Sequence, residues 1–332
     1  MNKISPDAYS TASQNPTFLF APAIAPTGND LHQLMRDPAS VCCFEQFLTS
    51  LTVRDITFEC EGDGPLAQHP GFPGAVRQAI GSQLMKTASR EALAGLPCPW
   101  GPACGFQVFF NMPQDKTGDM ATRITPPWIL RTETADATSV RITMRLFGLG
   151  LLWASEISDA CHRAIEEGIY IGGLGPVCDS VLIRSVENVW TDLDDEQKDA
   201  DRAMLSFVTP FHDAAGDTAQ SIAEQFLAGL IDRATVVARW HGVSPDGDFA
   251  KIKQALSDCQ CDDAGLAEVK WNRTVSQQRS ASIAMHGQTG LLQLRLPEQN
   301  RLEILQLLRV GELLHCGSML AFGQGRYKLY LI

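Results

Sequence analysis

Hydrophobic residues recur along the chain with two different periods, and each period predicts a different kind of element. An apolar residue stands at every fourth position between Val76 and Ala88, which indicates a helix over residues 73–94. Residues 47–60 instead show a rough alternation of polar and apolar side chains, many of them β-branched, and this predicts a strand. Gly- and Pro-rich segments between such regions predict loops.

The first half of the chain is predicted to contain a strand, a helix, two strands, a helix and a strand. These elements lie at residues 47–60, 73–94, 128–134, 139–148, 153–167 and 181–189. The same order returns in the second half, at residues 205–209, 218–240, 269–275, 282–296, 297–308 and 327–332. Two successive βαββαβ units predict an α+β fold of two tandem ferredoxin-like, RRM-like domains.

Charge and composition place the domain boundaries. Residues 1–40 are rich in Pro, Asn, Ser and Asp and are predicted to be irregular. Residues 191–202 hold six acids and two bases, which is typical of a solvated linker. We therefore expect an N-terminal domain at 41–190 and a C-terminal domain at 203–332, the latter interrupted by an acidic insertion at 241–265 with a short helix.

The overall charge argues against a protein coated in basic residues. There are 38 acidic and 27 basic side chains in 332 residues, so the formal net charge is −11. This disfavours a non-specific nucleic-acid binder. A local basic groove is compatible with it, because exposed charges more than about 10 Å apart are largely screened at 0.1 M salt.

Neither a metal nor a cofactor is predicted. The ten cysteines form no CxxC pair and show no Cys/His spacing typical of a zinc site. The sequence also has no P-loop, no dinucleotide-binding fingerprint and no GxSxG nucleophile elbow. The apolar stretch at residues 18–26 is short and broken by prolines, and no window holds 18 uninterrupted apolar residues. A cytoplasmic protein with free thiols and no membrane partner is the simplest interpretation.

Glycines gather in the last segment, at Gly311, Gly317, Gly323 and Gly325. Such a loop either makes a tight connection into an edge strand or lays free N–H groups against a phosphate. Basic residues follow it and also occupy the predicted hairpin around Trp271. The candidate RNA-binding residues are Lys270, Arg273, Arg279, Gly317, Ser318, Gly323, Gly325, Arg326 and Lys328.

If the second unit folds as predicted, the hairpin and the last strand share a sheet, and their basic residues line one groove. Cations beside aromatic rings suit a phosphate chain with splayed bases. The alternative is a set of ordinary strand residues on a solvated face.

Five stretches carry a resemblance to a known family. They are GAVRQAIGSQL (residues 74–84), CGFQVFF (104–110), RLFGLG (145–150), WNRTVSQQR (271–279) and LLHCGSMLAFGQGRY (313–327). In this order they resemble motifs of the CRISPR-associated endoribonucleases that process precursor CRISPR RNA, members of the repeat-associated mysterious protein (RAMP) superfamily. The last stretch resembles the family's C-terminal glycine-rich loop. The resemblance runs from about residue 50 to the end.

The resemblance implies two ferredoxin-like domains and a metal-independent cleavage of CRISPR repeat RNA. In that reaction the 2′-hydroxyl attacks the adjacent phosphate, leaving a 2′,3′-cyclic phosphate and a 5′-hydroxyl. It needs a base, an acid and a cation. The implied enzyme stays bound to its product, the mature crRNA, and can join a CRISPR effector complex.

Candidate catalytic residues follow from the matching stretches. His315 alone of the seven histidines lies inside a motif, and His69 precedes the first predicted helix. Arg77 and Arg273 are candidates for the cation. His315 can equally be a packed loop residue, and an arginine-only site stays open. The motif expects Lys where this chain has Ser318. The other histidines, which have no such context, are His32, His162, His212, His241 and His286.

Two further functions stay open. One is a RAMP subunit that binds crRNA within an effector complex without cutting it. The other is a two-domain protein unrelated to RNA, which the acidic net charge favours.

Overall fold

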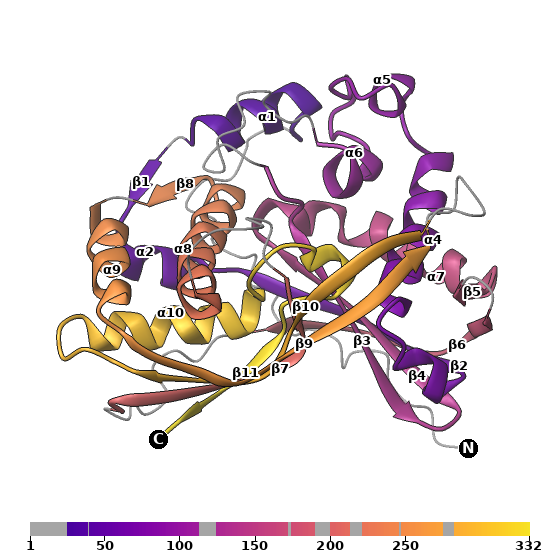
Figure 1. The fold of residues 1–332 in the computed structure, drawn as a ribbon. Helices are drawn as coiled ribbons and strands as arrows, with labels where there is room; N and C mark the ends of the chain where they lie inside the picture. Colours follow the sequence, from indigo (N-terminus) through magenta and orange to yellow (C-terminus); the bar gives the residue numbers. More distant parts are fainter. Residues whose placement is uncertain are drawn as a thin grey trace, which may run out of the picture.

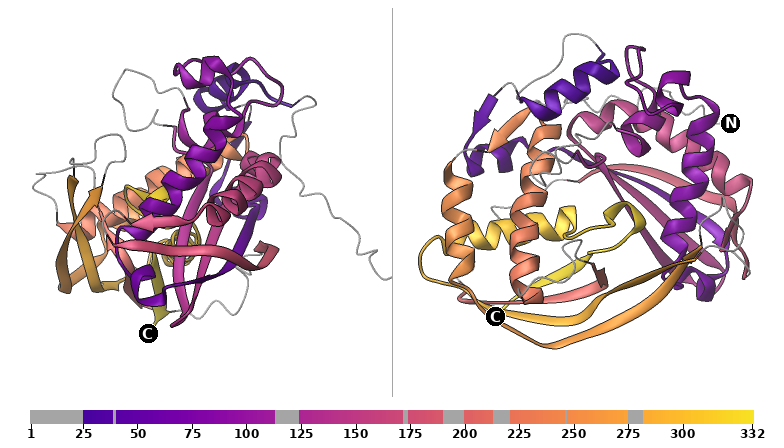
Figure 2. Two further views of the ribbon diagram at one scale, coloured as in Figure 1. Left: turned by 90° about the vertical axis from the view of Figure 1, so that its right-hand side faces the viewer. Right: turned by 45° about the horizontal axis from the view of Figure 1, so that its top comes forward.

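The structure is a computed structural model. It describes residues 25–38, 40–112, 124–171, 174–189, 200–212, 221–245, 247–274 and 282–332. Two sheets lie side by side, with helices packed around them (Figures 1 and 2).

The first half forms an antiparallel sheet with the strand order β3-β4-β2-β6-β5. The strands are β2 (Val53–Gly62), β3 (Trp128–Asp136), β4 (Ser139–Phe147), β5 (Ile169–Ile171) and β6 (Gly175–Val189). Two helices, α4 (Phe72–Lys86) and α7 (Ala154–Glu166), follow β2 and β4 in the chain and pack against each other. Without the short β5, this is the order of a ferredoxin-like unit.

The second half repeats the arrangement, with the antiparallel order β11-β7-β10-β9. Its strands are β7 (Arg202–Phe211), β9 (Gln260–Thr274), β10 (Ser282–Arg295) and β11 (Tyr327–Leu331). The helices α8 (Ile222–Trp240) and α10 (Arg301–Leu314) pack together. The prediction of two tandem ferredoxin-like units is therefore confirmed.

Smaller elements surround this framework. They are α1 (Gly28–Arg36), β1 (Ser40–Cys42), α2 (Phe44–Ser50), α3 (Gly64–Ala67), α5 (Arg90–Leu93), α6 (Gly105–Phe110), η2 (Gly148–Trp153), β8 (Val243–Pro245), α9 (Gly247–Ser257) and η3 (Leu320–Phe322). The short helix expected in the acidic insertion corresponds to α9. The strands β1 and β8 pair in parallel, which ties the start of the chain to the second half. The predicted domain limits stay a prediction, since the linker falls largely on residues 190–199, outside the described residues.

Two predictions for the N-terminal region were wrong. Residues 1–40 were expected to be irregular, but Gly28–Arg36 form α1, whose start is capped by reciprocal hydrogen bonds between Thr27 and Asp30. The strand expected over 47–60 begins only at Val53. Before it, Phe44, Phe47 and Leu48 have helical spacing and are buried on one side of α2.

Helix capping and strand pairing also place the ends of other elements at residues different from those predicted. The helix expected over 73–94 ends at Lys86, because Ser89 accepts a hydrogen bond from the Ala92 N–H and begins α5. Residues 105–110, which lie between two predicted elements, form α6. The end of the predicted acidic insertion belongs to β9, which starts at Gln260 and makes the hairpin much longer than expected.

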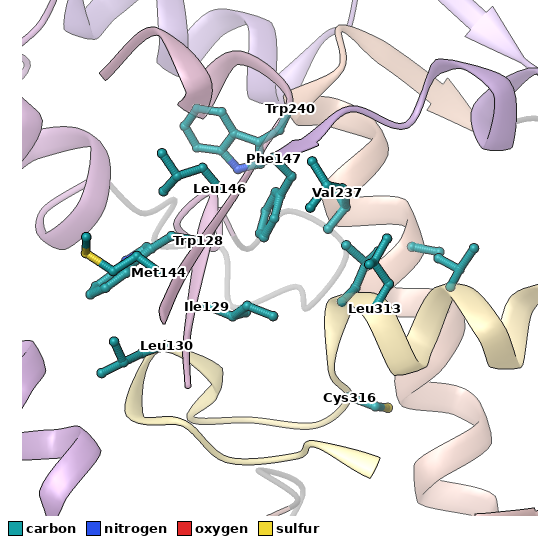
Figure 3. Packing of buried hydrophobic residues seen from close by; sticks show 14 of the residues in the cluster. Trp128, Ile129, Leu130, Met144, Leu146, Phe147, Val237, Trp240, Leu313 and Cys316 are labelled. Atoms are coloured by element: carbon teal, nitrogen blue, oxygen red, sulfur yellow. The ribbon is translucent and has the colours of Figure 1, made fainter. Parts of the chain in front are cut away.

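The two halves share one apolar interface. Phe147 of β4 faces Val237 and Trp240 of α8 in Figure 3, and all three side chains are buried. Gly148 has a φ of 55°, and a Cβ there would collide with the Trp240 carbonyl oxygen. Only glycine fits such an approach. The relative placement of the halves is therefore fixed by close packing.

The β9–β10 hairpin projects beyond the second sheet. β7 pairs with β10 only from Gln288 onward, whereas β9 pairs with β10 from Ser282. Most of β9 is exposed. In the outer part of the hairpin, among the described strands, β9 and β10 therefore pair with each other alone, and this two-stranded arm runs across the front of the molecule in Figure 1.

Candidate functional site

The glycine-rich loop joins α10 to β11 through a sharply turned backbone. Gly317, Gly323 and Gly325 have φ values of 98°, 76° and 73°. A Cβ at Gly325 would collide with the Cys316 carbonyl oxygen, and the Gly325 N–H donates to the Pro210 carbonyl at 2.9 Å. The loop therefore lies tightly against the end of β7.

The same loop touches the first half of the chain. A Cβ on Gly323 would lie 2.8 Å from the Cβ of Pro73, at the start of α4. The Arg77 guanidinium lies 5.0 Å from the Phe322 ring and 4.3 Å from the Phe110 ring. Arg77 is half-buried and stacks on aromatic rings. Its position links α4 to the loop.

Beneath the loop, a carboxylate holds two arginines on the first sheet. Arg145 donates to both oxygens of Asp55, at 2.7 and 2.8 Å, and to the Leu313 carbonyl at 2.9 Å. Arg131 donates to Asp55 Oδ2. Burial, and then the charge of Arg145, lower the pKa of Arg131. β3 and β4 thus supply cations that reach the last turn of α10.

Further arginines bridge the halves. Arg326, just before β11, pairs with Glu133 of β3. Burial alone would raise the pKa of Glu133, but the hydrogen bond from Arg326 and the surrounding cations lower it. Arg233 of α8 donates to the Leu314 carbonyl and to the Thr125 hydroxyl of the first half, both at 3.2 Å, and burial lowers its pKa to about 9.

A pocket of about 530 Å³ opens between the halves, next to these groups. One acidic residue lines it, Glu312, whose pKa is raised by burial. Five cationic residues line it: Arg131, Arg145, Arg309, Arg326 and Lys328. We call this the basic pocket. Two of its cations, Arg326 and Lys328, were predicted to bind RNA.

His315 is buried among the arginines. Its side chain is 1% exposed, and neither ring nitrogen has a hydrogen-bond partner among the residues that the structure describes. Burial, and then the charges of Arg131, Arg145, Arg326 and Arg233, hold its pKa well below 6.5. In this conformation the ring is closed off from solvent, so the geometry favours the packed alternative over the catalytic one.

Ser318 lies on the other side of the loop, against the end of β7. Its Oγ is 2.6 Å from Nδ1 of His212, and its N–H donates to the His212 carbonyl at 2.8 Å. The ring of His286, from β10, lies 5.0 Å from that of His212 between centroids. Sequence reasoning set both histidines aside. Neither histidine lies in a recognisable motif. They come close to the loop only in the folded structure, where β7 and β10 lie next to each other.

The remaining candidates lie on other elements. His69 is half-buried in the turn before α4, and its Nδ1 accepts a hydrogen bond from the Gly71 N–H at 3.0 Å. Lys270 on β9 is 74% exposed and pairs with Glu268 at 3.1 Å. Arg273 lies near the end of β9, close to the hairpin tip, and Arg279 lies outside the described residues.

The arginines of the first sheet were also missed, although they left a signal. Arg141, Thr143 and Arg145 alternate with buried apolar residues along β4. Their partners on β2 are Glu59, Thr57 and Asp55, directly opposite in the register. Alternating charged residues on an otherwise apolar strand indicate a polar sheet face.

No metal site emerges from the part of the chain that the structure describes: it contains no group of three or more His, Cys, Asp or Glu side chains placed to hold an ion. Among the described helices, none is long and apolar enough to span a membrane.

Comparison with known proteins shows the fold. No protein-family model matches the sequence, and no curated protein matches it. Among solved structures, the chain is similar to Cas6 (TTHB231) of Thermus thermophilus in a product complex, with a TM-score of 0.52 and 16% identity. It is also similar to Cas6 (TTHA0078) in a product complex, with a TM-score of 0.51 and 15% identity. Both comparisons cover 84% of this chain and 99% of the other. The chain therefore has the fold of these Cas6 proteins.

Proposed function

We propose that this protein binds CRISPR repeat RNA and cleaves it to mature crRNA without a metal ion, retaining the product. The basic pocket is the observation that carries the proposal. In a chain of net charge −11, five cationic side chains from both halves converge on one cavity. The likeness in fold to two Cas6 product complexes supports RNA as the ligand.

The pocket has the chemistry of a phosphate site. Arg145 and Arg131 are held in place by Asp55, so they are ordered before a ligand arrives. Lys328 is exposed at its edge, and Arg309 is half-buried. Guanidinium groups bind phosphate oxygens in a fixed fork geometry, and Lys adds a mobile point charge. A volume of about 530 Å³ accommodates a phosphate with its ribose.

The proposed reaction needs no redox partner. The 2′-oxygen forms a bond to phosphorus while the bond to the 5′-oxygen breaks, giving a cyclic phosphate. His69 and Arg77, at the start of α4, stay candidates for proton transfer and for the cation. Lys270 would guide the RNA along the hairpin, and Arg273 and Arg279 stay candidates for RNA binding. Gly317, Gly323 and Gly325 shape the loop that separates the basic pocket from Ser318.

A non-catalytic role is the second candidate. Two observations favour it: His315, the histidine inside the matching motif, is closed off from solvent, and Ser318 replaces the expected Lys. In that case the protein would bind crRNA as a structural subunit beside other CRISPR effector subunits. Both functions would operate in the cytoplasm.

The test uses the full chain, labelled repeat RNA and EDTA. We expect salt-dependent binding and discrete cleavage to a cyclic-phosphate end; binding without cleavage supports the structural subunit. The double substitution Arg309→Gln with Lys328→Gln should weaken binding. The slope of the logarithm of the binding constant against the logarithm of the salt concentration should also become less steep. We expect a change of about 0.7 for each phosphate that the variant no longer neutralises.

The control is Lys86→Gln on α4. Lys86 is 57% exposed and pairs with Glu167 at 2.8 Å, so it offers the same kind of charge removal away from the pocket. We expect wild-type binding from this control. If repeat RNA does not bind at low salt, or if all three proteins show the same salt slope, the proposal is wrong.

A further inference from the structure

The contact between the glycine-rich loop and β7 fixes the position of one imidazole. Ser318 meets His212 three times: its Oγ lies 2.6 Å from Nδ1 and 3.0 Å from the carbonyl oxygen, and its N–H donates to that carbonyl at 2.8 Å. A side chain held by a backbone-anchored hydroxyl keeps one ring orientation. This is what a proton-transferring histidine requires.

A second imidazole faces the first. The rings of His212 and His286 lie 5.0 Å apart with an angle of 45° between their planes. They belong to different elements, since His212 follows β7 and His286 lies on the projecting part of β10. His286 is exposed and His212 half-buried, so both differ from the enclosed His315.

The surroundings suit a nucleotide. A cavity of about 490 Å³ runs beside His286 along the hairpin, and Lys270 lies directly opposite His286 in the β9–β10 register. Trp271 and Asn272 line the same cavity. An aromatic ring can stack a base, an amide can read its edge, and the lysine can meet a phosphate. Glu268, paired with Lys270, is the acidic residue of the lining.

We propose that His212 and His286 form the acid–base pair of the RNA cleavage, with Ser318 as the residue that positions His212. This inference rests on the proposed function and deepens it. One imidazole takes the proton of the 2′-hydroxyl as the 2′-oxygen bonds to phosphorus. The other, protonated, gives its proton to the departing 5′-oxygen. One proton is taken up and one released, so the pair ends each cleavage in the opposite protonation state and exchanges protons with water.

The proposed pair accounts for the absence of a lysine at position 318 of the loop. Ser318 stands where the resemblance expects Lys, and its hydroxyl serves His212 instead of contacting a phosphate. Lys270 on the hairpin then supplies the nearby positive charge. Catalytic geometry would be assembled from three segments: the end of β7, the hairpin and the glycine-rich loop.

The test compares His212→Ala and His286→Ala with the wild-type protein on repeat RNA. General acid–base catalysis contributes about 10²- to 10⁴-fold, so each substitution should lower the single-turnover rate by at least about 100-fold. A second substrate carries sulfur in place of the 5′-oxygen at the cleaved bond. Sulfur leaves without a proton, so this RNA should restore the rate of the variant that lacks the acid and leave the other slow.

Folding and binding are checked separately. His162→Ala on α7 is the matched control, because His162 is 41% exposed and pairs only with Glu166 among the described ion pairs. It should cut at the wild-type rate. All three variants should melt within a few degrees of wild type and bind RNA, which separates loss of chemistry from loss of structure.

The outcomes separate this inference from the proposed function. Wild-type cleavage that neither alanine variant slows would overturn the histidine pair alone. If both variants are slow and the sulfur substrate restores neither, then neither histidine is the general acid, and the proposed pair is wrong. A wild-type protein that binds repeat RNA without cutting would contradict the proposed enzyme, and with it the pair.

Discussion

Histidines on the two sides of the glycine-rich loop lie in different environments. As a catalytic candidate, the sequence alone favours His315 over His212, whereas the structure leaves His212 the more accessible of the two. His315 lies at the start of the loop inside the matching motif, yet it is 1% exposed. His212 lies outside any motif, yet it contacts Ser318 of the loop and faces His286 on the solvent-accessible hairpin. The same type of side chain is thus enclosed on one side of the loop and accessible on the other.

Burial, and after it charge, lowers the pKa of His315. The four arginines around His315 make its protonated form costly, in addition to the cost of burial. The backbone at His315 is itself unusual, with φ 56° and ψ 165°, a region that glycine occupies far more readily. A side chain kept in such a conformation by its surroundings belongs to the packing of the domain interface.

A position in a motif and a role in chemistry are therefore separable. On the buried side, the loop and the arginines hold the halves together and present cations to the basic pocket. On the exposed side, the loop orients an imidazole. Each assignment can be broken by a change that affects only its own side.

The largest effect is expected at the anchor of the buried side. Asp55→Asn removes the charge that pairs Arg145 and Arg131. Asp55 is 8% exposed and Arg145 is 6% exposed. Breaking a buried ion pair by removing one partner destabilises a protein by about 3–5 kcal/mol. We expect a decrease of this size in the free energy of unfolding, measured by urea titration.

Glu59→Gln is the matched control for Asp55→Asn on the same strand. Its partner Arg141 lies opposite on β4, but their side chains are 33% and 41% exposed. Such exposed pairs contribute about 0–1 kcal/mol. Equal decreases in the two variants would show that the arginine cluster is not the structural anchor of this interface.

The next effect is a pH dependence of stability that His315 causes. An unfolded histidine binds a proton near pH 6.5, whereas the folded His315 resists protonation because its pKa is lowered. The unfolded state therefore binds more protons as the pH falls, and stability decreases. Between pH 7.5 and 5.5 this amounts to about 1.4 kcal/mol for one such group.

His315→Gly removes this contribution and suits the local backbone. The lowered pKa of the buried His241 acts in the same direction in both proteins and cancels in the comparison. We expect the stability difference between wild type and variant to change by about 1.4 kcal/mol across that pH range. The variant should keep its cleavage. Parallel stability curves, or a loss of cutting in a stable variant, would make His315 a catalytic candidate again.

Much of the fold was predictable because periodicity reports burial directly. The spacing of Val76, Ile80 and Leu84 predicted α4, and the core places all three side chains at 0% exposure. Capping was less visible: the Thr27–Asp30 pair begins α1 in a segment whose composition indicated a loop. Composition averages over a stretch, whereas one reciprocal cap is enough to begin a helix.

The site was less predictable, because its residues meet only through the fold. Arg326 and Lys328 were found from their place beside the glycines, and they line the basic pocket. Arg131 and Arg145 come from the other half, about 180 residues earlier in the chain. His212 and His286 are likewise brought together by the pairing of β7 with β10, in which Phe211 lies opposite Gln288.

The smallest effect sharpens the exposed side of the comparison. Ser318→Ala removes the hydroxyl that orients His212 and leaves the ring itself in place. A neutral hydrogen bond contributes about 0.5–1.5 kcal/mol, so the cleavage rate should fall by about 2- to 10-fold while the affinity for RNA stays unchanged. Ser318→Thr keeps a hydroxyl and should retain most of the rate. The control is Ser82→Ala on α4, which removes a hydroxyl that donates to the Gln78 carbonyl and should have no effect.

If alanine and threonine at position 318 lower the rate equally, then the size of the side chain in the loop, and not its hydroxyl, governs the position of His212. If instead RNA affinity falls with the rate, Ser318 contacts the RNA itself, as the lysine of the motif was expected to do.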